Sequence, residues 1–211
     1  MLLKFIRTIS WYIGRWIGYV TFDFFNKIID NVVLYFYSGL LYRKFRSIGR
    51  NVRFCRKITL VGGERISIGD NTYFNRNCIL TAIESFNGDS FTPQIVIGEN
   101  CNFGEYCHIT SINSIVIGDG VLTGRFVIMT DNAHGSSTIQ SLKKSPTRRE
   151  LYSKGPIVVG SNVWIGDKVT ICSGVSIGEN TIIAANTVVT KDVPSYCVYA
   201  GNPGRIVKDI K

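Results

Sequence analysis

Aliphatic side chains recur at every sixth position through the last third of the chain. They stand at Val159, Ile165, Ile171, Ile177, Ile183 and Val189, and a small or β-branched residue follows each of the first five after four positions. An α-helix cannot keep one face apolar at a period of six residues. The simple alternation of a β-strand does not require a period of six either. Short strands joined by tight turns fit this period. Three such strands in each coil form a triangular prism whose aliphatic side chains stack inside.

A shorter motif extends the repeat back to residue 48: an aliphatic residue, Gly, any residue, Asn or Gly, then a small residue. Its six copies begin at Ile48, Ile68, Ile97, Ile117, Val159 and Ile177. Gly and Asn suit turn positions because they tolerate unusual backbone angles. The glycines lie 20, 29, 20, 42 and 18 residues apart, and eighteen residues make three strands of six. The two longest intervals therefore predict segments that leave the coil, one around 86–93 and one that begins at Asp131.

This hexapeptide repeat resembles that of the left-handed parallel β-helix acyltransferases, in particular the sugar, maltose-galactoside and xenobiotic O-acetyltransferases. The resemblance covers about residues 48–208. It implies an all-β fold, a left-handed parallel β-helix of about six coils, to which the N-terminal segment adds a helical extension. We expect three parts: a basic amphipathic helical extension over 1–47, the β-helix over 48–194 with a protruding loop at about 131–158, and a C-terminal tail over 195–211 that packs on the β-helix.

The positive charge is concentrated at the N-terminus. The chain has 24 Lys and Arg against 15 Asp and Glu, a net charge of +9, and residues 1–57 supply all of that excess. Aliphatic and aromatic residues are interleaved with these basic ones, which fits a helix lying in the interface of an anionic membrane better than a nucleic-acid partner. The longest run without a charge, residues 31–42, is too short to cross a bilayer.

Two interpretations of residues 1–57 stay open: peripheral contact with a membrane, or packing on the main domain or on another subunit. A hydrophobic fraction of 45% with 18% charged residues excludes a disordered chain. The six cysteines include no C-x-x-C pair, and no secretory signal is recognisable, so we expect a cytoplasmic protein with reduced thiols. The repeat places Cys101 and Cys107 on inward positions, where other coils carry Val or Thr.

His134 is the stronger of two candidates for a general base, because histidine titrates near neutral pH and the chain has only His108 and His134. Its segment, Asp-Asn-Ala-His-Gly, resembles the Asp-x-x-His-Gly motif of sugar and xenobiotic O-acetyltransferases. The resemblance implies that His134 takes a proton from an acceptor hydroxyl that attacks the thioester of acetyl-CoA. Asn132 departs from the motif, because many relatives carry a second histidine there. Asp131 either orients His134 or holds a turn.

Four further residues are candidates for contact with the acceptor. His108 precedes an inward aliphatic residue and is expected to project outward from the prism. Glu105 and Tyr106 share its coil. Asn75 corresponds to a site asparagine of galactoside-type relatives, although an extra coil separates it from His134. For each of the four, the alternative is a solvated or structural surface residue.

The C-terminal coils carry the candidate donor site. Their motifs, at 162–166, 184–194 and 200–208, are similar to those with which the family holds the pantetheine arm of acetyl-CoA in the groove between neighbouring subunits of a homotrimer. The resemblance implies that Gly166, Ala184 and Ala185 let the thin arm approach the backbone. It makes Thr190, Lys191, Arg205 and Lys208 candidates for the nucleotide phosphates. Trp164 either contacts the donor or packs between subunits, and each of the others has a turn or surface role as its alternative.

We therefore predict an acetyl-CoA-dependent O-acetyltransferase that acts on a sugar hydroxyl in polysaccharide or lipid-linked glycan biosynthesis. No metal is expected, because the zinc enzymes with this repeat need three histidines. Three alternatives stay open: an N-acetyltransferase for a nucleotide-linked amino sugar, an antibiotic O-acetyltransferase, and a non-catalytic β-helix scaffold. Two interpretations of loop 136–156 stay open: it closes over a substrate, or it is a solvated charged loop.

Overall fold

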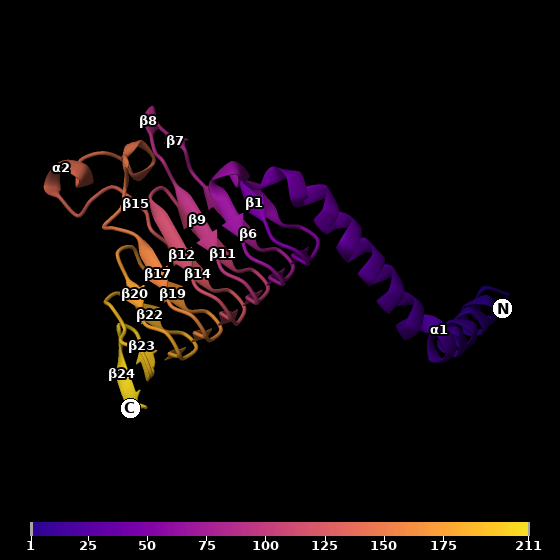
Figure 1. Ribbon diagram of the computed structural model, residues 1–211. Helices are drawn as coiled ribbons and strands as arrows, with labels where there is room; N and C mark the ends of the chain where they lie inside the picture. Colours follow the sequence, from indigo (N-terminus) through magenta and orange to yellow (C-terminus); the bar gives the residue numbers. More distant parts are fainter. Residues whose placement is uncertain (1, 211) are drawn as a thin grey trace.

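The computed structural model describes residues 2–210, and within its first helix it describes the side chains of residues 3–18 and 27–41. Most of the chain winds into three β-sheets that form the faces of a prism (Figure 1). Each coil contributes one short strand to each sheet in turn, and we name the sheets A, B and C in that order. Six full coils are present. The predicted β-helix of about six coils, with a helix before it, is confirmed.

Neighbouring strands run parallel, as β9 and β12 do. Sheet A contains β1 (Ser47–Ile48), β4 (Ile66–Ile68), β9 (Gln94–Ile97), β12 (Ser114–Ile117), β17 (Ile157–Val159) and β20 (Ser176–Ile177). Sheet B contains β2 (Arg53–Phe54), β5 (Tyr73–Phe74), β10 (Asn102–Phe103), β13 (Leu122–Thr123), β18 (Trp164–Ile165), β21 (Ile182–Ile183), β23 (Cys197–Gly201) and β24 (Gly204–Asp209). Sheet C contains β3 (Thr59–Val61), β6 (Ile79–Ala82), β11 (His108–Ser111), β14 (Ile128–Thr130), β19 (Thr170–Ile171) and β22 (Val188–Val189).

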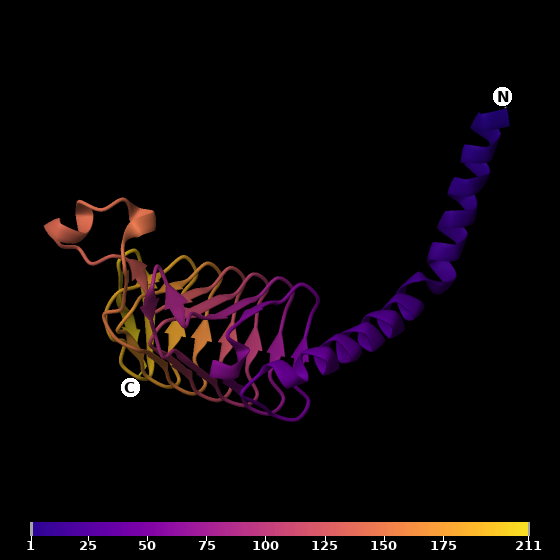
Figure 2. The ribbon, with the colours of Figure 1, turned by 90° about the horizontal axis from the view of Figure 1, so that it is seen from above.

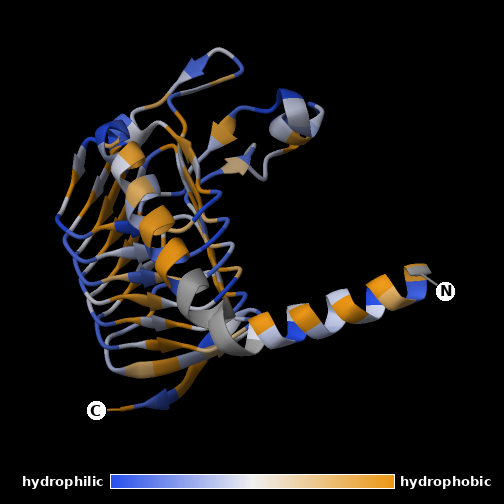
Figure 3. Cartoon of the chain, turned by 90° about the vertical axis from the view of Figure 1, so that its right-hand side faces the viewer, coloured by the Kyte–Doolittle hydropathy of each residue, from blue (hydrophilic) through white to orange (hydrophobic). Residues whose placement is uncertain are grey.

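Helix α1 (Leu2–Leu41) covers the first-coil end of the prism and continues away from it (Figure 2). Near its C-terminal end, Ser38 is buried and its hydroxyl accepts the N–H of Phe54 at 2.8 Å. The short 3-10 helix η1 (Tyr42–Lys44) then leads into β1. Residues 3–18 are all exposed, the apolar ones included (Figure 3). No helix in the described part of the chain has a stretch long and apolar enough to cross a membrane.

The aliphatic period forms the inside of the prism. In sheet A, Ile95, Ile115 and Ile157 lie in register on adjacent coils, and each is 0% exposed. The six aliphatic residues that recur between positions 159 and 189 are at most 2% exposed. Full burial of one such side chain contributes about 1.5–3 kcal/mol. The repeated inward position therefore supplies most of the apolar burial that holds the coils together.

Cys101 and Cys107 lie inside the prism, as the repeat predicts, and both are 1% exposed. The Cys101 thiol donates to the carbonyl oxygen of Gly118 on the next coil at 3.2 Å. Burial raises the pKa of both thiols. A thiol with a raised pKa is a poor nucleophile, so both cysteines serve the packing of the coils.

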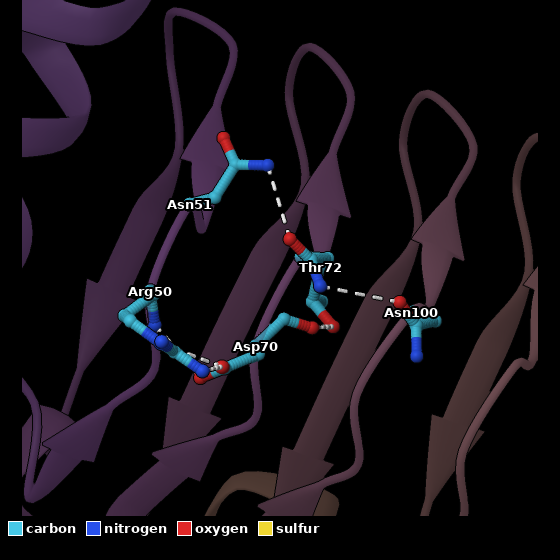
Figure 4. Close-up of polar contacts among 6 residues, drawn as sticks. Arg50, Asn51, Asp70, Thr72 and Asn100 are labelled. Atoms are coloured by element: carbon cyan, nitrogen blue, oxygen red, sulfur yellow. Dashed lines mark hydrogen bonds and ion pairs between the residues drawn. The ribbon is translucent and has the colours of Figure 1, made fainter.

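The turn between sheets A and B stacks asparagines from coil to coil. Asn51, Asn71 and Asn100 all have the left-handed φ that the motif predicts, between 55° and 56°. The amide of Asn51 donates to Asn71 at 3.1 Å, and the amide of Asn71 donates to Asn100 at 3.3 Å (Figure 4). Beside them Arg50 pairs with Asp70 at 2.9 Å (Figure 4). The stacked side chains align successive coils at this corner.

Four phenylalanines stack through the core of the first three coils. The rings of Phe45, Phe54, Phe74 and Phe103 lie 5.3, 5.0 and 4.7 Å apart in that order and are nearly parallel. The last three are 0% exposed. Phe45 comes directly after η1, so this column of rings continues the core of the prism toward the end that α1 covers.

Two insertions leave the prism where sheet C ends and sheet A begins (Figure 1). After coil two comes a hairpin of β7 (Ser85–Phe86) and β8 (Asp89–Ser90). After coil four comes the long loop with β15 (Ala133–His134), α2 (Ile139–Leu142), the 3-10 helix η3 (Pro146–Arg148) and β16 (Leu151–Tyr152). The amide of Asn87 donates to the carbonyl oxygen of Thr147 at 2.8 Å, so the two insertions touch.

The C-terminal residues extend sheet B. Strand β23 pairs parallel with β21, and β24 turns back antiparallel on β23. The last hairpin thus extends sheet B at the end of the prism opposite α1.

A smaller turn precedes coil two, where the 3-10 helix η2 (Gly63–Arg65) carries Arg65 into an ion pair with Glu84 at 2.6 Å.

The phenylalanine stack makes a stability prediction. Phe74→Ala removes two ring contacts and opens a cavity between two coils, so we expect the free energy of unfolding to fall by about 3–5 kcal/mol. Phe74→Leu keeps most of the volume and is expected to cost clearly less. Denaturant unfolding followed by circular dichroism measures both. Equal losses for the two variants would contradict the role given to ring stacking.

Candidate active site

His134 lies where the two insertions meet. It is in β15, whose antiparallel pairing with β16 sets it opposite Leu151. Its ring meets Phe86 of the neighbouring hairpin edge-on, with centroids 5.3 Å apart and planes at 68°. The imidazole is nevertheless exposed. The aromatic contact therefore supports the ring on one side while the ring stays accessible.

Glycine is required directly after His134. Gly135 has a φ of +87°, which ordinary residues rarely adopt, and a side chain there would collide with Ser141 and Arg149. Its N–H donates to the carbonyl oxygen of Glu150 at 2.8 Å. The turn folds the rest of the loop back beside His134, so the His-Gly pair of the motif has a local structural reason.

A cavity of about 380 Å³ opens beside this turn. Its lining is mostly polar and consists of Gly135, Ser136, Thr138, Gln140, Ser141, Lys144, Glu150, Leu151 and Tyr152. Lys144 and Glu150 form an ion pair at 3.1 Å across the loop. Hydroxyl, amide and charged groups that converge on a small cavity suit a polyhydroxylated ligand, because each can donate or accept a hydrogen bond.

Asp131 is buried at the start of the loop, with 0% exposure. Its carboxylate accepts hydrogen bonds from the Ser111 hydroxyl at 2.5 Å and from the N–H groups of Ile112 and Asn113 at 2.9 and 3.0 Å. Its carbonyl oxygen accepts the hydroxyl of Ser173 at 2.8 Å. The carboxylate therefore holds the turn at the end of coil three, and the carbonyl oxygen joins Asp131 to the end of coil five. Of the two roles considered for Asp131, these contacts correspond to holding a turn.

The candidate acceptor residues lie at a different corner from His134. Glu105 and Tyr106 stand between β10 and β11, where sheet B passes into sheet C, and Asn75 stands one coil earlier, accepting the N–H of Arg76 at 3.1 Å. The four residues of β11 separate this corner from the His134 loop, about 13 Å at the usual strand rise. Within one chain the structure does not bring these residues to His134.

Aromatic side chains mark the corner between sheets B and C. Tyr106 and Phe126 stack there on adjacent coils, with ring centroids 4.7 Å apart and planes at 5°. Both have a left-handed φ, 59° and 58°, which is unusual for bulky residues. They are 47% and 48% exposed. The left-handed φ itself belongs to the repeat, because Lys57, Asn77 and Lys168 have it at the same turn of other coils, so the exposed rings are what distinguish this corner.

His108 is half-buried at the sheet B end of β11. In the register of sheet C it lies between Ile79 and Ile128. Burial lowers its pKa, because desolvation penalises the charged imidazolium. Burial thus favours the neutral ring beside the corner that carries Glu105 and Tyr106.

Most of the candidate donor residues gather on sheet B and its corner with sheet C. Trp164 is 53% exposed on β18. Gly166 follows it, and a side chain there would come within 2.6 Å of the Ala185 nitrogen, so close stacking of the coils requires this glycine. Ala184 stands beside Ala185.

Four polar candidates for the donor divide between two places. Arg205 and Lys208 are exposed on β24, the edge strand of sheet B. Thr190 and Lys191 are exposed after β22, at the corner between sheets C and A. That corner also carries the His134 loop, two coils earlier. The structure thus separates the eight donor candidates into a group of six and a group of two.

The sequence motifs do not predict the side chains that contact His134 and Asp131. Phe86, which contacts His134, belongs to a segment recognised only as a polar loop. Ser111 and Ser173, which bind Asp131, carry no motif. The described residues contain no group of three His, Cys, Asp or Glu side chains placed to hold a metal ion.

Family models match two parts of the β-helix. The bacterial transferase hexapeptide model, which describes six repeats, matches residues 156–191. The model for the hexapeptide repeat of succinyl-transferase matches residues 94–124. Both matches fall in segments that the structure shows as regular coils.

Relatives of known assignment cover more of the chain. The galactoside O-acetyltransferase of Escherichia coli K12 is 32% identical over 173 residues, 82% of this chain and 68% of the relative. A second protein of the same strain, assigned as a lipopolysaccharide biosynthesis O-acetyl transferase, is 36% identical over 54% of this chain and 60% of its own length.

Solved structures share the fold. The N-acyltransferase AntD of Bacillus cereus, in complex with dTDP and 3-hydroxybutyryl-CoA, covers 83% of this chain and 88% of its own, with 21% identity and a TM-score of 0.68. A hexapeptide-repeat acetyltransferase of Vibrio cholerae, complexed with acetyl-CoA, covers 82% and 76%, with 25% identity and a TM-score of 0.54. The fold is thus the left-handed parallel β-helix, and the extended match to the galactoside enzyme shows that this chain belongs to the hexapeptide-repeat acetyltransferases.

Proposed function

We propose that the protein transfers the acetyl group of acetyl-CoA to a hydroxyl group of a sugar, with His134 as the general base. The observation that carries this proposal is the position of His134, exposed beside a polar cavity at the meeting point of two insertions. The names of the O-acetyltransferase relatives support the reaction. The acetyl-CoA complex of the Vibrio structure supports the donor.

The reaction requires one proton transfer in each direction. His134 accepts the proton of the acceptor hydroxyl while its oxygen bonds to the thioester carbonyl carbon. The resulting tetrahedral oxyanion collapses, the carbon–sulfur bond breaks, and the leaving sulfur takes the proton from the imidazolium. Direct transfer of this kind needs both substrates bound together and no acetylated enzyme. Asp131 contributes by positioning the loop that carries His134.

The nucleotide of acetyl-CoA would bind to the six donor candidates on sheet B and at its corner with sheet C. Arg205 and Lys208 supply the positive charge that phosphates require. Trp164 supplies an exposed aromatic face next to the small corner residues. Thr190 and Lys191 lie instead on the side of His134, where the thioester end has to arrive.

A homotrimer would bring together the two corners that are far apart within one chain. The corner with Glu105, Tyr106 and His108 of one subunit would face His134 of the next and complete the acceptor site. The exposed stack of Tyr106 and Phe126 supports this arrangement, because apolar surface of that kind is usually covered by a partner.

The N-terminal half of α1 is proposed to lie on the cytoplasmic surface of a membrane, so that the acceptor is a glycan attached to a lipid. At 100° per residue, one arc of the helix carries the exposed apolar residues Phe5, Ile6, Ile9, Ile13 and Trp16. The opposite arc carries Lys4, Arg7 and Arg15, with Trp11 among them and its ring beneath the Arg15 guanidinium. This is the division expected of an interfacial helix.

Replacing the proposed base tests the function directly. His134→Ala is expected to lower kcat by about 10²–10⁴-fold, the usual contribution of a general base. Release of CoA on a panel of sugar acceptors measures the rate, and calorimetric titration with acetyl-CoA is expected to give nearly unchanged affinity. A variant that keeps most of its activity would contradict the mechanism. Acetylation confined to amino groups of the panel would favour the N-acetyltransferase alternative.

The role of Asp131 is tested by separating stability from catalysis. Asp131→Ala leaves three donors of a buried turn without an acceptor, so we expect the free energy of unfolding to fall by roughly 3 kcal/mol or more. Because the carboxylate binds residues 111–113 and not His134, kcat per folded molecule is expected to fall much less than in His134→Ala. A folded Asp131→Ala variant that loses as much kcat as His134→Ala would indicate a direct partnership.

Subunit mixing tests whether the site is shared. His134→Ala lacks the base, and the double variant Glu105→Ala/Tyr106→Ala lacks the facing corner, so each trimer alone is expected to be nearly inactive. Random mixed trimers place an intact His134 against an intact corner in about one quarter of the sites. We therefore expect mixing during refolding to restore activity toward that fraction. No recovery would mean that both sets of residues act within one chain.

A further inference from the structure

A second cavity, of about 770 Å³, lies between α1 and the first coils. It is separate from the His134 loop, because its coil residues belong to the corner between sheets B and C. Four of its lining residues are basic: Lys27 from α1, Arg56 and Lys57 from the first coil, and Arg76 from the second.

The cavity has an excess of positive charge. Asp30 and Glu105 are its acidic lining residues, so four basic less two acidic groups leave +2. Among the described residues, none of the four basic side chains forms an ion pair, whereas the ion pairs of the structure lie elsewhere. Uncompensated basic groups around one cavity create a favourable potential for an anion.

Two arginines also converge on Tyr73, which lines the same cavity. Arg53 lies over its ring, 5.3 Å from the centroid, and the Arg53 Nε is buried without a hydrogen-bond partner in the described structure. Arg53 and Arg76 both act to lower the pKa of Tyr73, although burial outweighs them and raises it to about 12. The hydroxyl therefore stays protonated, and it shares a hydrogen bond with the Cys55 thiol at 2.9 Å.

The cavity combines this charge with an apolar wall. Val33 and Leu34 of α1 line one side and are half-buried. Farther along the same helix lies the apolar arc of residues 5–16 described above. A ligand that fits both features carries a compact negative charge next to an apolar chain.

We propose that this cavity binds the phosphate groups of a membrane lipid, as the headgroup end of the lipid-linked acceptor. Arg side chains suit phosphate because the guanidinium donates two parallel hydrogen bonds. Glu105 and Tyr106 line the cavity and also belong to the corner assigned above to the acceptor, so a glycan leaving the phosphates would pass them first. This identity of the ligand rests on the proposed function, whereas phosphate binding does not.

The test compares two double variants with equal loss of charge. Arg56→Gln/Lys57→Asn removes two cavity charges, and Asn suits the left-handed φ of 67° at position 57. Arg43→Gln/Lys44→Gln removes two exposed charges of the same segment outside the cavity. Circular dichroism of the full chain checks that both variants fold.

Calorimetric titration with inorganic pyrophosphate measures the phosphate site alone. We expect saturable binding near one site per chain in the unmodified protein. Each basic residue near an anionic surface contributes about fivefold to affinity. The cavity variant lacks two of them, so its affinity for pyrophosphate is expected to fall roughly thirtyfold. The control variant is expected to lose no more than about threefold. Equal losses, or no saturable binding, would overturn the site.

Vesicle binding then tests whether the phosphate belongs to a lipid. The unmodified protein and the control variant are expected to prefer phosphatidylcholine vesicles that contain phosphatidic acid over phosphatidylcholine alone. The cavity variant is expected to show a clearly smaller preference than the control variant, while Lys4, Arg7 and Arg15 of α1 retain the same remainder in both. If pyrophosphate binding is lost but the two variants show equal preference, the lipid assignment is overturned in favour of a soluble phosphate. Neither assay contains acetyl-CoA, so their failure is distinguishable from failure of acetyl transfer.

Discussion

Stacking of one coil on the next is the constraint on which the other features of the molecule depend. Each inner strand of the prism takes its backbone partners from the coils above and below it, and inward side chains such as Ile95, Ile115 and Ile157 meet in register. Gly166 shows how little space remains, because a single added carbon would reach the next backbone. Extra chain can therefore leave only at a corner. Both insertions do so at the same corner, and this places Phe86 against His134.

The sequence predicted the regular part of this structure well, because only inward positions must repeat. The aliphatic period from 159 to 189 and the Asn turns each reflect a constraint that recurs at the same place in successive coils. The contacts of the site obey no such period. Asp131 binds residues 111–113, and Asn87 binds Thr147 sixty residues away. These pairings depend on which insertions share a corner and how far each reaches, and no local pattern records either.

The same geometry separates the proposed acceptor residues from the proposed base within one chain. Sheet C is about four residues wide at β11, and its two ends carry different chemistry: His134 at one corner, and Glu105 and Tyr106 at the other. A prism is too stiff to bring its own corners together, because closing that distance would break the hydrogen bonds of the sheet. In the proposed trimer, opposite corners of neighbouring prisms meet, and the exposed stack of Tyr106 and Phe126 lies at one of these corners.

The coils also order the proposed ligands along one axis. The cavity for lipid phosphate lies at coils one to three, His134 follows coil four, and the donor candidates occupy coils five and six with the last hairpin. Adjacent coils are about 4.8 Å apart, so the six coils span roughly 24 Å. A lipid-linked glycan held at the α1 end would extend along the prism toward His134, while acetyl-CoA would approach from the other end. The positive charge of residues 1–57 therefore lies at the end of the molecule where this arrangement needs an anionic lipid.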